Sequence, residues 1–411
     1  MLGRRAADLA LSSPGQQLRR TENLVKNATR IVETLGDMKG AAMKIGQMLS
    51  LYEGMLPPEV AEVLQTLQRE APRAPAEVMR YELEGSLGGS VEEFLSEFEP
   101  EAFAAASIGQ VHRGRLLDGR DVAIKIQYPL ISEIVRADLK NLKRLLGSLF
   151  AMAFEVDFEP IWGELKDRLL EELDYEHEAA NIRRMSELHA AIPEIVIPSV
   201  IEELSTDRVL VMERVEGIRP RDACSTAYSA EQKSQWGEVL FEFQFRGLFE
   251  HRLLHADPNL ANFAFLEGGQ VVVYDFGCLK RVPADVAAGY SGVVRAVMEG
   301  RRTEVPDALM RLGLHKKGPT PLPQEVIDPY IDLLGEILRA SPTYAFGEDP
   351  DFYGRIMELG MANWSHSVDM QFPQDVVFID RSLAGHFGNL TRLGAAGPWR
   401  RIVEHYANLS I

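Results

Sequence analysis

The chain has 411 residues, a hydrophobic content of 46% and a formal net charge of −17 at pH 7. This length is sufficient for a two-lobed enzyme with a full core. The net negative charge argues against a nucleic-acid-binding protein, because phosphate contacts need clustered Lys and Arg. Its two cysteines, Cys224 and Cys278, cannot by themselves build a disulfide framework or a zinc site.

Residues 1–50 differ from the rest of the chain in charge, with eight Lys or Arg against four acids. A basic amphipathic start can contact an anionic membrane surface, although a solvated helix face is the more common cause of such a pattern. No apolar run reaches the ~18 residues of a membrane-spanning helix. The segment after Met1 lacks the apolar core of a secretory signal. We therefore expect a cytoplasmic protein, with peripheral membrane contact as the alternative.

The first part of the chain, residues 1–95, is predicted to be a helical extension. Apolar residues at helical spacing and proline starts indicate four helices: 18–35, 38–52, one from Pro57, and one from Ala76 that closes within 85–90. The Pro-rich segment 71–75 predicts a loop before the last of them.

Residues 96–216 are predicted to form a smaller lobe that contains strands. Segments 107–117 and 121–127 indicate two strands joined at Leu117-Asp-Gly-Arg120, because Asp-Gly is a hairpin turn signal. Two further strands are expected within 200–213, around Thr206-Asp207. Helices are expected over 131–149 and, as one long element, over 160–190.

Residues 217–411 are predicted to form a helical lobe. We expect a helix over 230–252, a polar loop, strands at 263–266 and 270–274, and helices from 284–299 to the end. Strands first and helices after, each around its own core, predict an α+β fold with two lobes.

The segment His255-Ala-Asp-Pro-Asn-Leu-Ala-Asn262 carries the strongest chemical signal. Asp257 and Asn262 are five residues apart, and Asp275-Phe-Gly277 follows an apolar strand. In kinases, the catalytic Asp precedes a metal-binding Asn by this spacing, and the Asp of an Asp-Phe-Gly triplet binds magnesium. Alternatively, Asp257 is a helix-capping residue before Pro258, and His255 is a structural hydrogen-bonding residue without a catalytic role.

Lys125, in Val122-Ala-Ile-Lys125, is placed to bind the phosphates of ATP from the second hairpin strand. A surface lysine on an edge strand is the alternative. The helix over 160–190 offers several acids as its partner, of which Asp174 and Glu178 are four apart and are expected to share an inward face, although runs of acids are usually solvated.

Two further segments are expected to contact the nucleotide. The loop before Lys125 is rich in alanine where phosphate-binding loops are rich in glycine, and its nucleotide-contacting residues would be Ala104, Ala105, Ala106, Ser107 and Gly109. The strand that ends at Glu213 is placed to bind adenine. After Gly277 the chain enters the next helix almost directly and lacks an Ala-Pro-Glu motif, so the activation segment of a protein kinase is missing.

With these motifs assembled, the chain resembles the UbiB/AarF family of atypical kinases over roughly residues 35–300. The matching positions are Lys44-Ile-Gly-Gln47, the alanine-rich loop, Lys125, Glu172-Leu-Asp174, Glu178, Asp257, Asn262 and Asp275. Asn259 and Leu260 depart from the commoner bacterial form of the family, and the membrane-spanning C-terminal helices of some members are absent.

The resemblance implies a protein-kinase-like fold whose N-terminal extension covers the active site, with Lys44 pointing into it and meeting Glu172. It implies ATP and Mg²⁺ as cofactors, Asp257, Lys125, Glu178, Lys44 and Glu172 as catalytic residues, and Asn262 and Asp275 as metal ligands. It also implies slow ATP hydrolysis or small-molecule phosphorylation that supports ubiquinone biosynthesis.

Lipid quinone precursors, an anionic membrane surface, and a protein complex or homodimer are the partners considered beside ATP. Two alternative functions stay open: a protein serine/threonine kinase, and a nucleotide-binding scaffold without catalysis.

Overall fold

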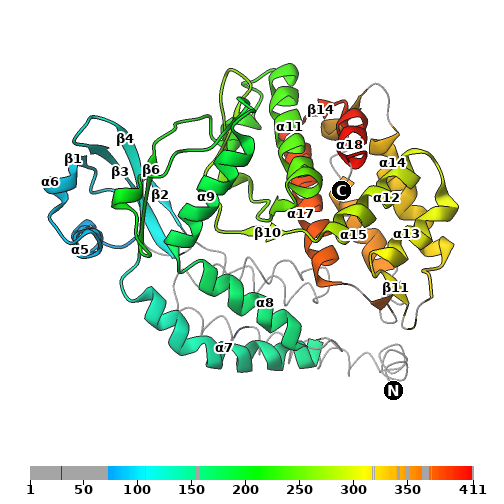
Figure 1. The fold of residues 1–411 in the computed structure, drawn as a ribbon, viewed down its shortest axis with the longest axis horizontal. Coiled ribbons are helices and arrows are strands. Elements are labelled where there is room, and N and C mark those ends of the chain that lie inside the picture. The colour runs from blue at the N-terminus through cyan, green and yellow to red at the C-terminus, as the bar shows by residue number, and fades with distance from the viewer. Residues whose placement is uncertain are drawn as a thin grey trace. The chain divides into compact units, whose positions relative to one another are not determined.

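The computed structural model describes residues 29, 73–106, 108–153, 158–316, 318, 320–339, 343–348, 352–362, 370–371 and 373–409 (Figure 1). Apart from position 29, the three helices expected before residue 73 lie outside this part, as do Lys44 and Ser107. Within it, no helix is both long and apolar enough to cross a membrane.

The chain divides into two compact units. One comprises Met1–Ala180 with Ser199–Arg214, and the other Asn181–Pro198 with Val215–Ile411. Both contain helices and strands, so the fold is α+β, as expected. The division into domains 1–95, 96–216 and 217–411 stays a prediction.

The first unit is organised around a five-stranded sheet. Strands β1 (Leu95–Phe98), β3 (Gly109–Leu116), β4 (Asp121–Gln127) and β6 (Val209–Glu213) follow one another in that order, and β2 (Ala104–Ala105) also pairs with β3. The predicted β3–β4 hairpin is confirmed, with Gly119 at φ 91° in its turn. On β4, Val122, Ile124 and Ile126 are buried at every second position, which gives the sheet one apolar face.

Helices α5 (Ala76–Leu87), α6 (Val91–Phe94), α7 (Ile131–Ala153) and α8 (Phe158–Glu171) also belong to the first unit. The predicted start of α5 is confirmed, and its end is set by Gly88 at φ 74°, a left-handed conformation that glycine adopts without strain.

The single helix expected over 160–190 is wrong, because the chain breaks between α8 and α9 (Tyr175–His189). The Asp174 side chain accepts the backbone N–H of His177 at 3.1 Å, as an N-cap residue does, and the Tyr175 N–H donates to Asp207 O at 3.0 Å. Asp174 is therefore exposed while Glu178 is buried. The expectation that these two acids share an inward face is also wrong, since the second helix begins after Asp174.

The first of the two strands expected within 200–213 is reduced to one bridge, Val200 to Met212, followed by the 3-10 turn η3 (Glu202–Leu204). The Ser205 hydroxyl explains the turn. It donates to Ile201 O at 2.9 Å and accepts the Val211 N–H at 3.0 Å. A side chain thus supplies bonds that a strand would take from its neighbour.

The second unit is mostly helical. Its longer helices are α11 (Ala230–Phe245), α12 (Ala284–Met298), α14 (Gln324–Leu338), α15 (Phe352–Ala362), α17 (Gln374–Leu393) and α18 (Trp399–Ala407). Shorter helical elements are α10 (Pro220–Ala223), η4 (Arg246–Glu250), η5 (Leu260–Asn262), η6 (Arg302–Glu304), α13 (Val305–Arg311) and η7 (Phe346–Glu348). A cluster of aromatic side chains fills the core between α11, α17 and α18: Phe241, Phe346, Phe352, Phe387 and Trp399.

Four small sheets complete this unit. Strand β9 (Val271–Val273) lies between β8 (Phe263–Phe265) and β5 (Ile195–Val196). Strands β8 and β9 were predicted, at 263–266 and 270–274, and their antiparallel pairing is added by the structure. The pairs β7 (Leu253–His255) with β10 (Leu279–Arg281), β11 (His315–Lys316) with β13 (Met370–Gln371), and β12 (Tyr344–Ala345) with β14 (Ala396–Gly397) were not predicted.

Two histidines of the second unit, the buried His189 and the half-buried His251, pack against each other. The His189 ring lies 5.1 Å from the ring centroids of both His251 and Phe243, and its Nδ1–H donates to Met185 O at 2.9 Å. Burial lowers the pKa of His189 to about 4 and that of His251 to about 4. Both imidazoles are therefore neutral in the folded protein near pH 7.

We expect the protein to lose stability as the pH falls from about 6.5 to about 4. In this window the unfolded chain binds a proton at His189 that the folded chain does not bind, so the free energy of unfolding decreases by up to about 1.4 kcal/mol per pH unit. Urea unfolding at several pH values would measure this slope. His189→Leu should reduce this slope by the contribution of one proton, since other histidines with lowered pKa values remain, whereas His177→Leu, at an exposed position of the same helix, should leave it unchanged. Equal slopes in all three proteins would contradict the interpretation.

Candidate active site

Lys125 and Glu178 form a buried ion pair in the first unit. The Lys125 Nζ lies 2.9 Å and 2.7 Å from the two carboxylate oxygens of Glu178, and the two side chains are 12% and 5% exposed. The Nζ also lies 4.8 Å from the ring centroid of Tyr175. Because α9 begins after Asp174, Tyr175 and Glu178 are three residues apart on one helix face, and both reach the same ammonium group.

Strand β4 is an interior strand, since it pairs with β3 on one side and with β6 on the other. A solvated lysine on a sheet edge, which was the alternative for Lys125, is therefore ruled out. A lysine kept in place by a buried carboxylate presents a positioned positive charge, which is what binding of a polyphosphate needs.

The alanine-rich segment pairs with β3, on the edge of that strand opposite to β4. Ala104 and Ala105 pair with Val111 and Gln110 on β3, and the Ala106 N–H donates to Gly109 O at 3.0 Å. A Cβ atom on Gly109 would lie 2.1 Å from Ile126 O, so close backbone packing requires glycine here. Contact of this segment with a nucleotide stays a prediction.

Three further predicted site residues are Glu213, Glu172 and Lys44. Glu213 is exposed at the end of β6, and its N–H donates to Ser199 O at 2.8 Å, so that N–H is engaged within the sheet. Glu172 is half-buried in the α8–α9 connection. Lys44, its predicted partner, lies outside the described residues, and the Lys44–Glu172 pair therefore stays a prediction.

In the second unit, the Asp257–Asn262 loop is fastened to the Asp275–Gly277 segment. Strand β7 pairs with β10, and the Ala256 N–H donates to Cys278 O at 2.9 Å. The Tyr274 N–H donates to Asn262 O at 2.9 Å. His255 Nε2 donates to Asp275 O at 2.7 Å. Main-chain pairing and the His255 bond thus place the segments of Asp257, Asn262 and Asp275 next to each other, and the roles of the three residues stay a prediction.

Local hydrogen bonds shape each of the three side chains. Asp257 Oδ1 accepts the Asn259 N–H at 3.1 Å, and Asp275 Oδ1 accepts the Gly277 N–H at 3.0 Å. Asn262 Nδ2 makes a long contact of 3.5 Å with Asp257 O. Asp257 thus forms a local turn, whereas the side chain that caps η5 is that of Asn259, which accepts the Ala261 N–H at 3.1 Å, so the helix-capping alternative for Asp257 is wrong. This local turn and a chemical role are compatible, since the same carboxylate is partly exposed.

His255 has the structural role expected for it, because it donates to Asp275 O and its ring packs edge-on to Phe276 at 5.6 Å. Sequence reasoning missed Asn181 on α9, whose Nδ2 donates to Phe276 O at 2.9 Å. An asparagine one turn after Glu178 was the available signal, but only the fold shows that it reaches the Asp-Phe-Gly triplet.

The segment after this triplet is short. Residues 278–283 alone separate Gly277 from the start of α12 at Ala284, and 279–281 of them form β10. The expected absence of a long activation segment is therefore confirmed for this fully described stretch.

The donor set suits magnesium better than a softer metal. Asn262 and Asp275 offer an amide oxygen and a carboxylate, both hard oxygen ligands, and Mg²⁺ completes its shell with phosphate oxygens and water. Within the described residues, no three His, Cys, Asp or Glu side chains gather as ligands of one metal ion. Such a protein-only cage is not needed for Mg²⁺ bound together with a nucleotide.

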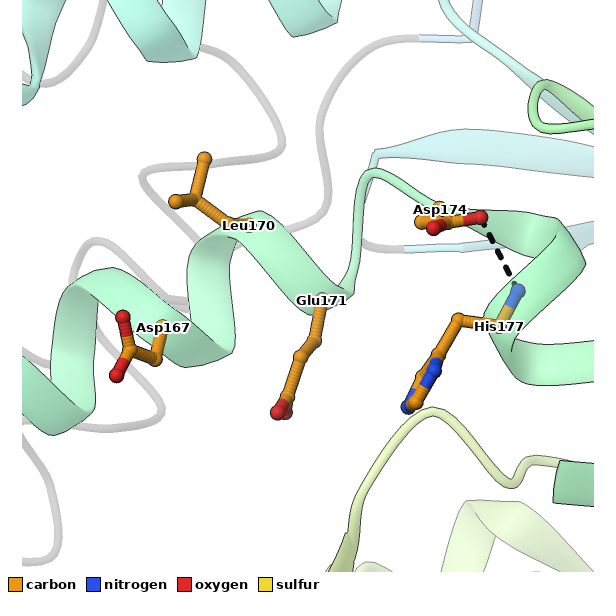
Figure 2. A pocket seen from close by; sticks show the side chains of 5 residues that line it. All are labelled: Asp167, Leu170, Glu171, Asp174 and His177. Carbon is orange, nitrogen blue, oxygen red and sulfur yellow. Dashed lines mark hydrogen bonds between the residues drawn. The ribbon is translucent and has the colours of Figure 1, made fainter.

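An open, acidic pocket of about 370 Å³ lies at the junction of α8 and α9. Figure 2 shows Asp167, Glu171 and His177 on one side of this junction, with Asp174 turned toward the first turn of α9. The pocket lies beside the Glu172-Leu-Asp174 motif and does not include Lys125. Its described lining has three carboxylates and no Lys or Arg, which does not favour a polyphosphate.

Glu178→Gln should destabilise the protein, because the buried ammonium of Lys125 would lose its counter-charge. We expect the free energy of unfolding to fall by about 3 kcal/mol. Glu176→Gln removes an exposed charge two residues earlier on the same helix and should change stability by less than about 0.5 kcal/mol. Urea unfolding of the two variants checks this, and equal losses would refute a buried, energetically coupled pair.

The comparison with known proteins agrees with these motifs. The family model described as ABC1 atypical kinase-like domain matches residues 66–308. Atypical kinase COQ8B, mitochondrial, from Rattus norvegicus is 35% identical over 375 residues, which is 90% of this chain and 70% of the relative. Atypical kinase coq-8, mitochondrial, from Caenorhabditis elegans is 30% identical over 92% of this chain, and the chain spans only 51% of that relative.

One solved structure is similar to this chain over nearly the whole length of both proteins. It is that of Rv3197 from Mycobacterium tuberculosis in complex with erythromycin, with a TM-score of 0.69, 28% identity, and coverage of 95% of this chain and 98% of the other. The family model covers more than half of this chain, and the rat relative is matched over most of its length. This chain therefore belongs to the UbiB/AarF family of atypical kinases.

Proposed function

We propose that this protein binds Mg-ATP and either hydrolyses it or transfers its phosphoryl group to a small molecule, in support of quinone-lipid biosynthesis. The observation that carries the proposal is the fastening of the Asp257–Asn262 loop to Asp275-Phe-Gly277 through main-chain pairing and the His255–Asp275 hydrogen bond. It is a kinase-type arrangement in a chain of the atypical kinase family.

Each predicted site residue has a defined task in this proposal. Lys125, held by Glu178, binds the phosphates, and Asp275 with Asn262 binds the metal ion. Asp257 orients the attacking oxygen and accepts its proton. Bound Mg²⁺ would neutralise charge on the phosphates. The remaining nucleotide contacts would come from the alanine-rich segment and the β6 end: Ala104, Ala105, Ala106, Ser107, Gly109 and Glu213.

The short 278–283 segment supports a small acceptor or water over a protein substrate, because a protein kinase presents its substrate on a longer activation segment. The proposed position of Lys44 beside Glu172 also supports a small acceptor, since the helix that carries Lys44 would fill the space of a protein substrate. A protein serine/threonine kinase and a non-catalytic scaffold are the less favoured functions.

Asp275→Asn should abolish magnesium-dependent ATP binding, because a hard cation loses its charged ligand. The measurement is the thermal shift caused by ATP with and without Mg²⁺. Asp285→Asn, at an exposed position in the first turn of α12, is the matched control and should keep the shift. A magnesium-dependent shift that persists in Asp275→Asn would remove this residue from the metal site.

The proposed link to quinone lipids predicts that ATP turnover rises several-fold with anionic vesicles or with a phenol that mimics the head group of a quinone precursor. The membrane part of the expectation rests on the basic residues of 1–50. Steady-state phosphate release would be compared with phosphatidylglycerol vesicles and with zwitterionic vesicles of the same size. Turnover that is indifferent to both additives would reject the lipid link and leave the ATP site standing.

A further inference from the structure

We propose that helix α17 positions Asp257 for catalysis through three residues, Ser382, Gly385 and Asn389, which we call the loop-facing side of α17. This inference rests on the proposed function, since Asp257 is a catalytic residue only if the chain turns over ATP. The helix lies outside residues 66–308, the part that the family model matches.

Two side chains of the loop-facing side bind the carbonyl groups on either side of Asp257. Asn389 Nδ2 donates to Pro258 O at 2.7 Å, and the Ser382 hydroxyl makes a longer contact of 3.5 Å with Ala256 O. Both side chains are buried, at 3% and 2% exposure. A buried amide that satisfies a carbonyl next to the catalytic position restricts the backbone there, since breaking the bond would leave both groups unpaired.

Gly385 brings the Pro258 ring directly onto the backbone of the helix. A Cβ atom at this position would lie 2.4 Å from Cγ and 2.6 Å from Cβ of Pro258. The ring therefore occupies the space that any other side chain would need. Residues 382, 385 and 389 are spaced by three and four, so they share one helix face, and this face is shaped to the loop that contains Asp257.

A fourth residue of α17, His386, extends the contact to the strand that leaves the loop. Its ring packs edge-on to Phe263 at 5.9 Å. Both ring nitrogens lack a hydrogen-bond partner within the described residues, and burial lowers the pKa of His386 to about 3. The residue is thus a neutral ring that packs, whereas Asn389 supplies the directional bond.

The helix itself is held from other directions. Phe387 stacks on Phe346 at 5.6 Å and meets Phe352 edge-on at 5.9 Å, within the aromatic core. Near the start of α17, Asp375 pairs with Lys280 of β10 at 2.9 Å. The loop therefore rests on a helix that is fixed both to the core and to the strand following Asp275-Phe-Gly277.

A glycine pair on the same helix offers a matched test. Gly385→Ala inserts a methyl group against Pro258, whereas a Cβ at Gly388 would meet no atom within 4 Å. We expect Gly385→Ala to lower kcat for ATP hydrolysis roughly tenfold or more, since small displacements of a catalytic group have large effects on rate. KM should change less than about twofold. Gly388→Ala should keep wild-type kinetics and an equal or higher melting temperature.

A second measurement does not depend on activity. Hydrogen exchange of the peptide spanning 254–263 should be faster in Gly385→Ala and in Asn389→Leu, which keeps volume but removes the donor, and unchanged in Gly388→Ala. If the wild-type protein hydrolyses no ATP, the proposed function fails, and the exchange data still decide whether α17 holds the loop. Exchange at the wild-type rate in both Gly385→Ala and Asn389→Leu would overturn the inference. Faster exchange spread over the whole second unit would overturn it as well.

Discussion

The pairing of β7 with β10 is the constraint on which the candidate active site depends. Strand β7 precedes the Asp257–Asn262 loop and β10 follows the Asp275-Phe-Gly277 triplet, so their ladder holds close together the two segments that carry the proposed catalytic carboxylate and the proposed metal ligands. His255 adds a side-chain bond from one strand to Asp275 O. Backbone pairing is suited to this task, because it leaves the side chains of both segments available for chemistry.

The buried Lys125–Glu178 pair uses a different physical device. Its members come from an interior strand and from a helix that begins only after an aspartate cap. A desolvated ion pair adds little net stability, since desolvation offsets most of the attraction. It does keep an ammonium group in one place, which is what the proposed binding of nucleotide phosphates would require.

Helix α17 shows how distant parts of the chain complete a site. Its aromatic side belongs to the core. Its loop-facing side contacts the loop around Asp257 through the hydrogen bond of the Asn389 amide and through the Pro258 ring, which packs against Gly385. A glycine and an asparagine in a C-terminal helix carry no chemical signal in the sequence. Their importance follows from what they touch, which is the backbone beside a carboxylate.

Local sequence patterns were sufficient for the α+β class, the β3–β4 hairpin, strands β8 and β9, the helix after Pro283 and the order of Lys125, Asp257, Asn262 and Asp275, because turn signals, periodicity and motif spacing are local properties. They did not determine the break at Asp174, the turn at Ser205 or the β7–β10 ladder, since each depends on a partner distant in sequence or on a side chain that competes with regular structure. The residue pattern left several acids open as partners of Lys125; the tertiary structure shows Glu178 in that place and Asp174 as the cap of α9. Only the tertiary structure shows that Asn181 and Asn389 reach the Asp-Phe-Gly triplet and the Asp257–Asn262 loop. Such contacts join residues far apart along the chain, and a single sequence does not encode their proximity in any local pattern.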